Sequence, residues 1–163
     1  MDQQQQLPIK TVVDGWSTTL SRTRALFSSL SDEELQNEVS PGRNTGVYLL
    51  GHITAVHDRM LPLLGLGERK YPQLDDVFII SPDKSGKPKP PVAELRAQWE
   101  DVNGILTAAF SNMQPEEWLH RHTAISEEDF VKEPHRNKLN VLVSRTNHLA
   151  SHYGQLIFLK KNA

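Results

Sequence analysis

The stretch NHLASHYGQ, residues 147–155, says most about how this chain of 163 residues folds. It lies in a segment, residues 138–161, whose apolar residues recur at three- and four-residue steps, the period of an amphipathic helix. His148 and His152 stand four residues apart, so their rings project from one face of that helix, one turn apart. At about 100° per residue they flank its apolar stripe, which directs both imidazoles towards a helical core.

Three further segments, at about residues 8–30, 46–64 and 92–112, show the same helical periodicity. Eight glycine and proline residues lie between positions 65 and 91 and predict an extended crossover between the second and third helices. Four helices joined by one long crossover are typical of an all-α four-helix bundle. We therefore expect a flexible tail over residues 1–7 and a single helical domain over residues 8–163.

The ends of the first and third helices carry similar sequences. Ser31 and Glu34 form a capping box that predicts a short helical turn after the first helix. Residues 27–35 align without gaps on residues 110–118. The similarity is explained equally well by the residue preferences of helix ends and by an internal duplication, and either explanation supports two helical pairs.

Composition excludes several kinds of protein. The chain has no cysteine, so disulfides, thiolate nucleophiles and zinc fingers are excluded, and a metal site must use histidine, carboxylate or water. Eighteen Lys and Arg residues against 20 Asp and Glu residues give a net charge of −2, which argues against a nucleic-acid partner. The apolar runs fall far short of the roughly 20 residues of a membrane span, and the first residues do not resemble a signal peptide. We expect a cytoplasmic protein without a membrane partner.

His52 is the third histidine of interest, because it lies beside the apolar stripe of the second predicted helix. Antiparallel packing can place it opposite His148 and His152, where three imidazoles would bind zinc or nickel and leave coordination positions open. The alternative is that the pair on the last helix is an ordinary pair of core or surface histidines. His57 is expected to be a packing or interface histidine, and the adjoining Asp58 and Arg59 are expected to be charges at the surface or at an interface.

Six residues have simpler expected roles. His120, His122 and His135 lie in or beside polar loop sequence and are expected at the surface, the first two at most at the mouth of a pocket. The three tryptophans are expected in the core or at helix ends, and they are Trp16, Trp99 and Trp118.

The motif H-x-x-x-H-x-G-Q, here His148, His152, Gly154 and Gln155, together with Gly51-His52 on the second helix, resembles the DinB/YfiT-like metalloenzyme family. The resemblance covers nearly the whole chain and implies a DinB-like four-helix bundle with one divalent metal, zinc or nickel, held by His52, His148 and His152. Tyr153 is a candidate to support the metal ligands or to contact substrate, and because many relatives have arginine at this position, its contacts with substrate are expected to differ.

The family resemblance also implies chemistry. Its characterised members include transferases of low-molecular-weight thiols, an isomerase and metal-dependent hydrolases, often as homodimers and linked to stress. We therefore expect a metal-dependent transferase that adds a small thiol to an electrophilic small molecule; hydrolysis and non-catalytic metal binding are the alternatives. Around the metal, Gln155 is expected to hold a ligand imidazole or a water, and Gly154 to admit a neighbouring helix. Arg145 and Asn147 are candidates to meet an anionic cosubstrate, against the alternative of a solvated helix face. The crossover is expected to form a wall of the pocket or to cover a dimer interface.

Overall fold

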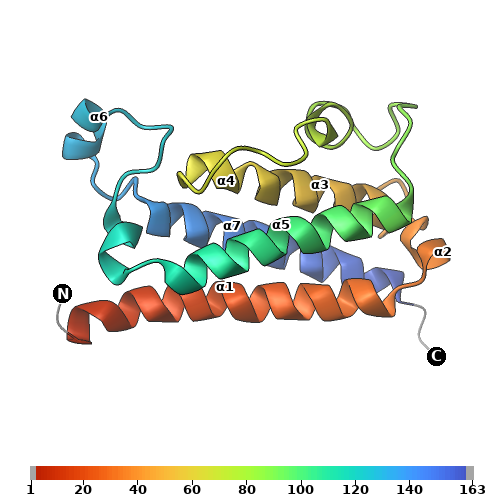
Figure 1. Cartoon of the computed structure of the whole chain (residues 1–163). Coiled ribbons are helices and arrows are strands. Elements are labelled where there is room, and N and C mark those ends of the chain that lie inside the picture. Colours follow the sequence, from red (N-terminus) through yellow and green to blue (C-terminus); the bar gives the residue numbers. More distant parts are fainter. Residues whose placement is uncertain (1–2, 161–163) are drawn as a thin grey trace.

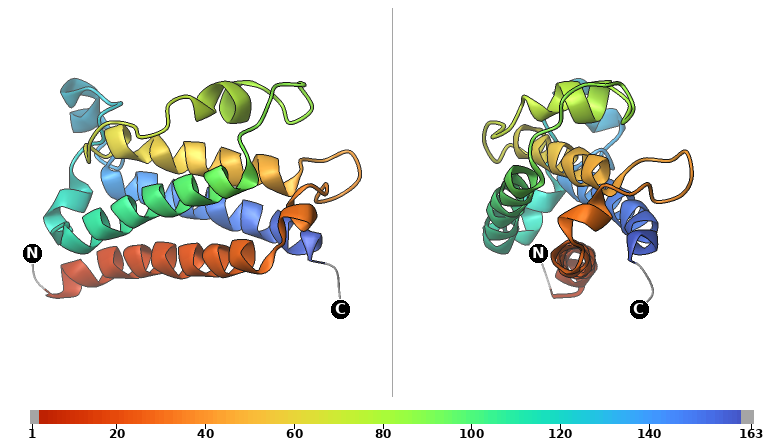
Figure 2. Two further views of the ribbon diagram at one scale, coloured as in Figure 1. Left: turned by 45° about the vertical axis from the view of Figure 1, so that its right-hand side comes forward. Right: turned by 90° about the vertical axis from the view of Figure 1, so that its right-hand side faces the viewer.

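The computed structural model describes residues 3–160, with side chains from Gln6 onwards, and the described part of the chain is helical without a β-strand. Four helices form the bundle: α1 (Gln3–Ser29), α3 (Gly46–Asp58), α5 (Val92–Asn112) and α7 (Lys138–Leu156). α1 and α7 run in one direction, and α3 and α5 run in the other (Figures 1 and 2). The predicted all-α four-helix bundle with a long crossover between its second and third helices is confirmed.

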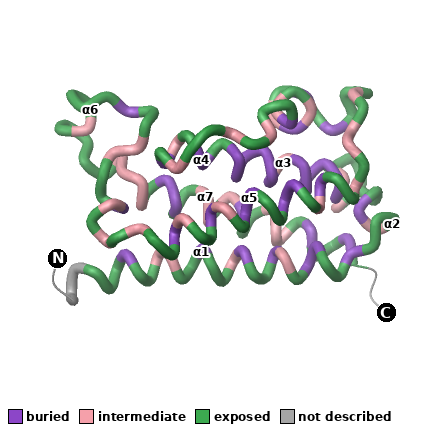
Figure 3. The backbone as a smooth tube through the Cα atoms, in the orientation of Figure 1, coloured by how far each residue is buried: buried purple, intermediate pink, exposed green. Residues whose placement is uncertain are grey.

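The core lies between these four helices. α1 packs beside α7, and α3 packs beside both α5 and α7. The tryptophans are buried as predicted, with Trp16 and Trp99 each 1% exposed and Trp118 2% exposed. Every residue of α3 is buried except His52, which is half-buried, so α3 is the inner helix of the bundle (Figure 3). None of the described helices is both long and apolar enough to cross a membrane.

The first helix begins earlier than the sequence predicted. α1 starts at Gln3 rather than near residue 8, so residues 3–7 of the expected tail are helical, while Met1 and Asp2 lie outside the described residues. Glutamine is a good helix former, and this run extends the helix in front of Pro8. The turn that follows α1 is as predicted: in α2 (Asp32–Leu35) the Ser31 hydroxyl accepts from the amide of Glu34, and the Glu34 carboxylate accepts from the amide of Ser31.

The predicted helix over residues 46–64 is interrupted. α3 ends at Asp58, and a short helix, α4 (Met60–Leu63), follows after Arg59. Pro62 has no amide hydrogen to donate to the carbonyl of Asp58, which weakens the helix at this point. The last helix is shortened in a similar way, because α7 ends at Leu156 and continues as a 3₁₀ turn, η3 (Ile157–Leu159).

Three short helices complete the described chain. The crossover, expected to be extended, contains a π-helical turn, η1 (Asp76–Ile80), that packs on α3 (Figure 1). A 3₁₀ helix, η2 (Pro115–Leu119), follows α5 and has its own capping box between Gln114 and Glu117, which parallels that of α2. The polar stretch before α7 contains α6 (Glu127–Lys132), capped by Ser126, which the sequence analysis did not predict.

The crossover is fixed to the end of α3 by a buried carboxylate. Asp58 is fully buried, and it accepts from the Nε of Arg69 at 3.0 Å and from the amides of Lys70 and Tyr71 at 2.7 and 3.1 Å. The expectation that Asp58 lies at the surface or at an interface is therefore wrong. The reason is that its partners come from a loop more than ten residues further along the chain, not from neighbours on its own helix.

Candidate metal centre

Three histidines converge where α3 and α7 pack against each other. The Nε2 atom of His148 lies 3.1 Å from the Nε2 of His52 and 3.1 Å from the Nε2 of His152. One ligand atom from each residue can be chosen so that all three lie within 4.8 Å of one another, and all three side chains are half-buried. His148 and His152 are brought together by one helical turn, whereas His52 reaches them through the antiparallel packing of α3 on α7.

The donor set fits a divalent metal ion. The Nδ1 of His52 donates to the carbonyl of Phe78 at 2.8 Å, and the Nδ1 of His152 donates to the Oε1 of Gln155 at 2.9 Å. In a neutral imidazole this leaves a lone pair on each Nε2, and both lone pairs are directed at the Nε2 of His148. One hydrogen on that atom cannot satisfy both, whereas a cation can accept all three lone pairs.

The spacing of the nitrogens agrees with this assignment. Zinc–nitrogen bonds of about 2.0–2.1 Å in a tetrahedral site place neighbouring ligand nitrogens roughly 3.3 Å apart. The two observed separations of 3.1 Å are close to that value. The sequence prediction that His52 joins the pair on α7 is therefore matched by the geometry, and the three residues could hold a metal ion.

The crossover orients His52. Phe78 of η1 lies directly against the backbone of Gly51, where a Cβ atom would come within 2.4 Å of two of its ring carbons. This close approach brings the Phe78 carbonyl to the imidazole of His52. Tyr48, one turn before His52, stacks on that imidazole and donates to the carbonyl of Ser81 at 2.8 Å. The role of Phe78 was not predicted, and the apolar run at positions 77–80 within the crossover is its only signal in the sequence.

Burial keeps two of the imidazoles neutral. It lowers the pKa of His148 to about 4, with further lowering by the neighbouring His152 and His52. It also lowers the pKa of His52, although the hydrogen bond to Phe78 partly opposes this shift. Because a metal ion binds neutral imidazole, the environment holds both side chains in the binding-competent form at neutral pH.

A cavity of about 240 Å³ opens beside the histidines. Two of the triad, His52 and His148, line it together with Arg145 and Arg59. The remaining lining residues are apolar, and they are Val56, Met60, Leu63 and Ile79. Arg59 is exposed, as expected, and it also lines the cavity while its guanidinium binds the carboxylate of Asp75.

The other residues proposed from the sequence lie in different places. Gln155 is exposed and holds the Nδ1 of His152, in agreement with its predicted role. Asn147 is exposed and does not line the cavity. Tyr153 packs against the core and lines a separate hollow with residues of α1, so it lies outside the cavity. A Cβ at Gly154 would meet nothing within 4 Å, and the expected close approach of another helix at this position is wrong.

The remaining histidines are not part of the cluster. His57 is fully buried between Trp16 and Trp99, and its Nδ1 donates to the Oδ1 of Asn103 at 2.7 Å, so it is a packing histidine. His120 and His135 are exposed and His122 is half-buried. Burial lowers the pKa of His122.

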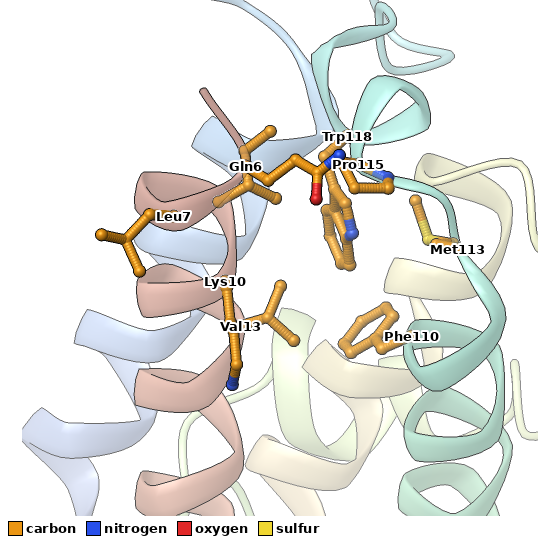
Figure 4. Close-up of a pocket in the computed structure, with 9 residues that line it drawn as sticks. Gln6, Leu7, Lys10, Val13, Phe110, Met113, Pro115 and Trp118 are labelled. Carbon is orange, nitrogen blue, oxygen red and sulfur yellow. The ribbon is translucent and has the colours of Figure 1, made fainter. Parts of the chain in front are cut away.

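A second cavity, of about 410 Å³, lies beside the N-terminal part of α1. Val13 of α1 faces Phe110, Met113 and Trp118 across it (Figure 4). Lys10, which lines it as well, is paired with Asp14 at 2.5 Å. No histidine lines this cavity, so the smaller cavity beside the triad is the one associated with the candidate metal centre.

Many antiparallel helical bundles hold metal ions with side chains that converge from facing helices. The fold and the histidine cluster described above have this arrangement. The chain belongs to the DinB superfamily, because the model of that family matches residues 16–156, a range that contains all three histidines. Comparison with curated proteins gave no significant match. The family expected from the sequence is thus confirmed.

Proposed function

We propose that this member of the DinB superfamily is a metal-dependent transferase, which joins a low-molecular-weight thiol to an electrophilic small molecule. The observation that supports the proposal best is the convergence of three imidazole nitrogens at the wall of a cavity. A divalent ion held there would supply Lewis-acid chemistry, lowering the pKa of a thiol or water that reaches it. In the transfer reaction the S–H bond breaks and a C–S bond forms, and the proton leaves with the departing group or adds to the electrophilic double bond.

The residues of the chain have separable roles in this proposal. His52, His148 and His152 would hold the ion, with His52 oriented by Phe78 and His152 by Gln155. The apolar side chains of the cavity would receive the body of the electrophile and exclude water from it. Because the chain has no cysteine, the thiol must come from solution.

Metal binding is the first property to test. We expect about one divalent ion per chain in protein purified without a metal-binding tag, and loss of that ion in His152→Ala. His135→Ala removes an exposed imidazole outside the cluster and is the matched control, which should keep its metal. A protein that binds no zinc or nickel when either is added, although it is folded by circular dichroism, would overturn the metal assignment.

Catalysis is tested separately with the metal-loaded protein. Glutathione and free cysteine are each mixed with 1-chloro-2,4-dinitrobenzene, and the thioether product is followed by absorbance and mass spectrometry. A rate above background that requires both thiol and metal supports transfer. Consumption of an ester or amide without a thiol would replace transfer by hydrolysis, and metal binding without either reaction would leave a binding protein. Cytoplasmic location, a homodimer, a link to stress and the absence of a nucleic-acid partner stay predictions from the sequence.

A further inference from the structure

Among the residues that the structure describes, one charged group in the cavity beside the triad has no partner. Arg145 projects from α7 into this cavity, and among the described side chains nothing forms an ion pair or hydrogen bond with its guanidinium. Arg59, the other arginine of the cavity, binds the carboxylate of Asp75 through two nitrogens, at 2.7 Å and 3.1 Å. The two arginines share a cavity but differ in pairing.

The surrounding charges show that Arg145 is uncompensated. Asp58 and Asp75 bind Arg69, and Asp75 also binds Arg59, so two carboxylates and two guanidinium groups balance each other. Arg145 therefore contributes one positive charge that no described side chain offsets.

The contrast between two arginines supports this point. Hydrogen bonds to Asp75 and Asp58 raise the pKa of Arg69. Burial, with a smaller contribution from the charge of Arg59, lowers the pKa of Arg145. The surroundings of Arg145 thus disfavour its charge, and an anion from solution would supply the missing acceptor.

The size and lining of the cavity limit what that anion can be. Its volume of about 240 Å³ is below the roughly 300–1,000 Å³ of pockets for drug-sized ligands, so a small molecule is expected. Met60, Leu63 and Ile79 line it with apolar surface. The planar guanidinium matches a carboxylate through two parallel hydrogen bonds, and a single arginine balances one negative charge.

We propose that this cavity binds a small carboxylic acid, its carboxylate on Arg145 and its apolar body against the apolar side chains that line the cavity beside the histidine triad. This inference names the substrate class of the proposed function, and only the role of the bound acid as a substrate rests on that function. Binding of the carboxylate itself depends on Arg145 and not on the metal. The reactants would then include an organic anion, anchored by Arg145 in the cavity that His52 and His148 line.

The test compares three probes that share an aromatic body. Phenylacetate, phenylacetamide and phenyl phosphate are titrated into the full chain, first metal-free and then with zinc, and binding is followed by shifts of amide and arginine Nε–H signals in NMR spectra. We expect phenylacetate to bind the metal-free protein about 10–100-fold more tightly than phenylacetamide, as one charge-assisted hydrogen-bonded pair predicts. Equal binding of the acid and the amide, or tighter binding of phenyl phosphate than of phenylacetate, would overturn the assignment of a carboxylate.

Two variants locate the binding group. Arg145→Met removes the guanidinium but keeps an apolar stem, and it should lower phenylacetate affinity at least tenfold. Arg59→Met makes the same change of charge in the same cavity at an arginine already paired with Asp75, and it should lower the affinity less than threefold. A larger loss in Arg59→Met than in Arg145→Met would refute the proposal.

Metal content and thermal midpoint are measured for each variant. Since Arg145 has no partner in the described chain, Arg145→Met should keep both the fold and the metal of the parent. Arg145-dependent binding of phenylacetate in a protein that holds no metal would support this inference while the proposed function fails. A protein that holds metal and catalyses thiol transfer but does not bind phenylacetate would support the proposed function and overturn this inference.

Discussion

Gly51→Ala is the substitution that best tests how the crossover and the histidine cluster are linked. The added Cβ would lie 2.4 Å from Cε1 and Cζ of Phe78 and 2.6 Å from Cδ1, closer than any real contact of this kind. Phe78 is fully buried, so its ring cannot swing into solvent and η1 must move away from α3. The Phe78 carbonyl would then leave the Nδ1 of His52, which it now meets at 2.8 Å.

The expected magnitude has two opposing parts. Overpacking a core costs about 1–3 kcal/mol, and a clash with three ring carbons belongs at the upper end of that range. Alanine is a better helix former than glycine by about 1 kcal/mol, which offsets part of the cost. We expect a net loss of about 2 kcal/mol in the free energy of unfolding. Loss of the group that orients His52 should also lower zinc affinity about 10–100-fold.

The assay is urea unfolding of the metal-free protein followed by circular dichroism, with zinc affinity measured by competition against a chelator. Gly154→Ala is the matched control, because the same methyl group beside His152 would meet nothing within 4 Å. It should leave zinc affinity unchanged and raise stability by up to about 1 kcal/mol. Adding Phe78→Leu to Gly51→Ala should reduce the cost of the alanine in a double-mutant cycle. If Gly51→Ala is as stable as Gly154→Ala and binds zinc like the parent, the linkage is refuted.

Two further substitutions test the buried polar groups. Lowering the pH from 7.5 to 5 should cost the metal-free protein about 2 kcal/mol of unfolding free energy through His57 alone, because the unfolded chain takes up a proton near pH 6.5 that the folded chain refuses. Burial lowers the pKa of His57 to about 3 in the folded protein, so this loss continues below pH 5 and is absent well above pH 6.5. His57→Gln should remove most of that contribution in urea titrations at the two pH values, and an unchanged pH dependence would contradict the assignment. Asp58→Asn should lower stability by about 2 kcal/mol, since a buried carboxylate that binds Arg69 loses its charge. Limited proteolysis should show faster cleavage of the loop after α4, and wild-type protection of that loop would count against its anchoring by Asp58.

The helices that could be predicted from the sequence are those whose ends are marked by nearby residues in the chain. α5 spans residues 92–112 as predicted, because Pro91 precedes it and the apolar period runs unbroken to Phe110. η1 was not predicted, since five residues among prolines and glycines carry no helical period of their own. Its contacts are with α3, and contacts between segments so distant in the chain have no local signal.

The candidate site divides in the same way. His148 and His152 are paired by the geometry of one helix, which the spacing of four residues reveals. Whether His52 joins them depends on the distance and rotation between α3 and α7, and neither quantity can be predicted from the sequence of one helix. The place of His52 beside the apolar stripe of its helix made it a candidate, and the family resemblance supported it as the third ligand. Asp58 was expected among the surface or interface charges, whereas its carboxylate is buried and binds Arg69, a partner that the sequence around Asp58 does not indicate.

The crossover contributes to the site at two points, and this explains why it is long. At one point Phe78 enters against Gly51 and holds the imidazole of His52 from behind. At the other, Asp75 neutralises Arg59 at the edge of the cavity while Arg69 ties Asp75 to the buried Asp58. A shorter connection between α4 and α5 would lose one or both of these contacts. The crossover therefore sets both the direction of one candidate ligand and the charge balance of the cavity, and substitutions within it should alter ligand binding without touching a histidine.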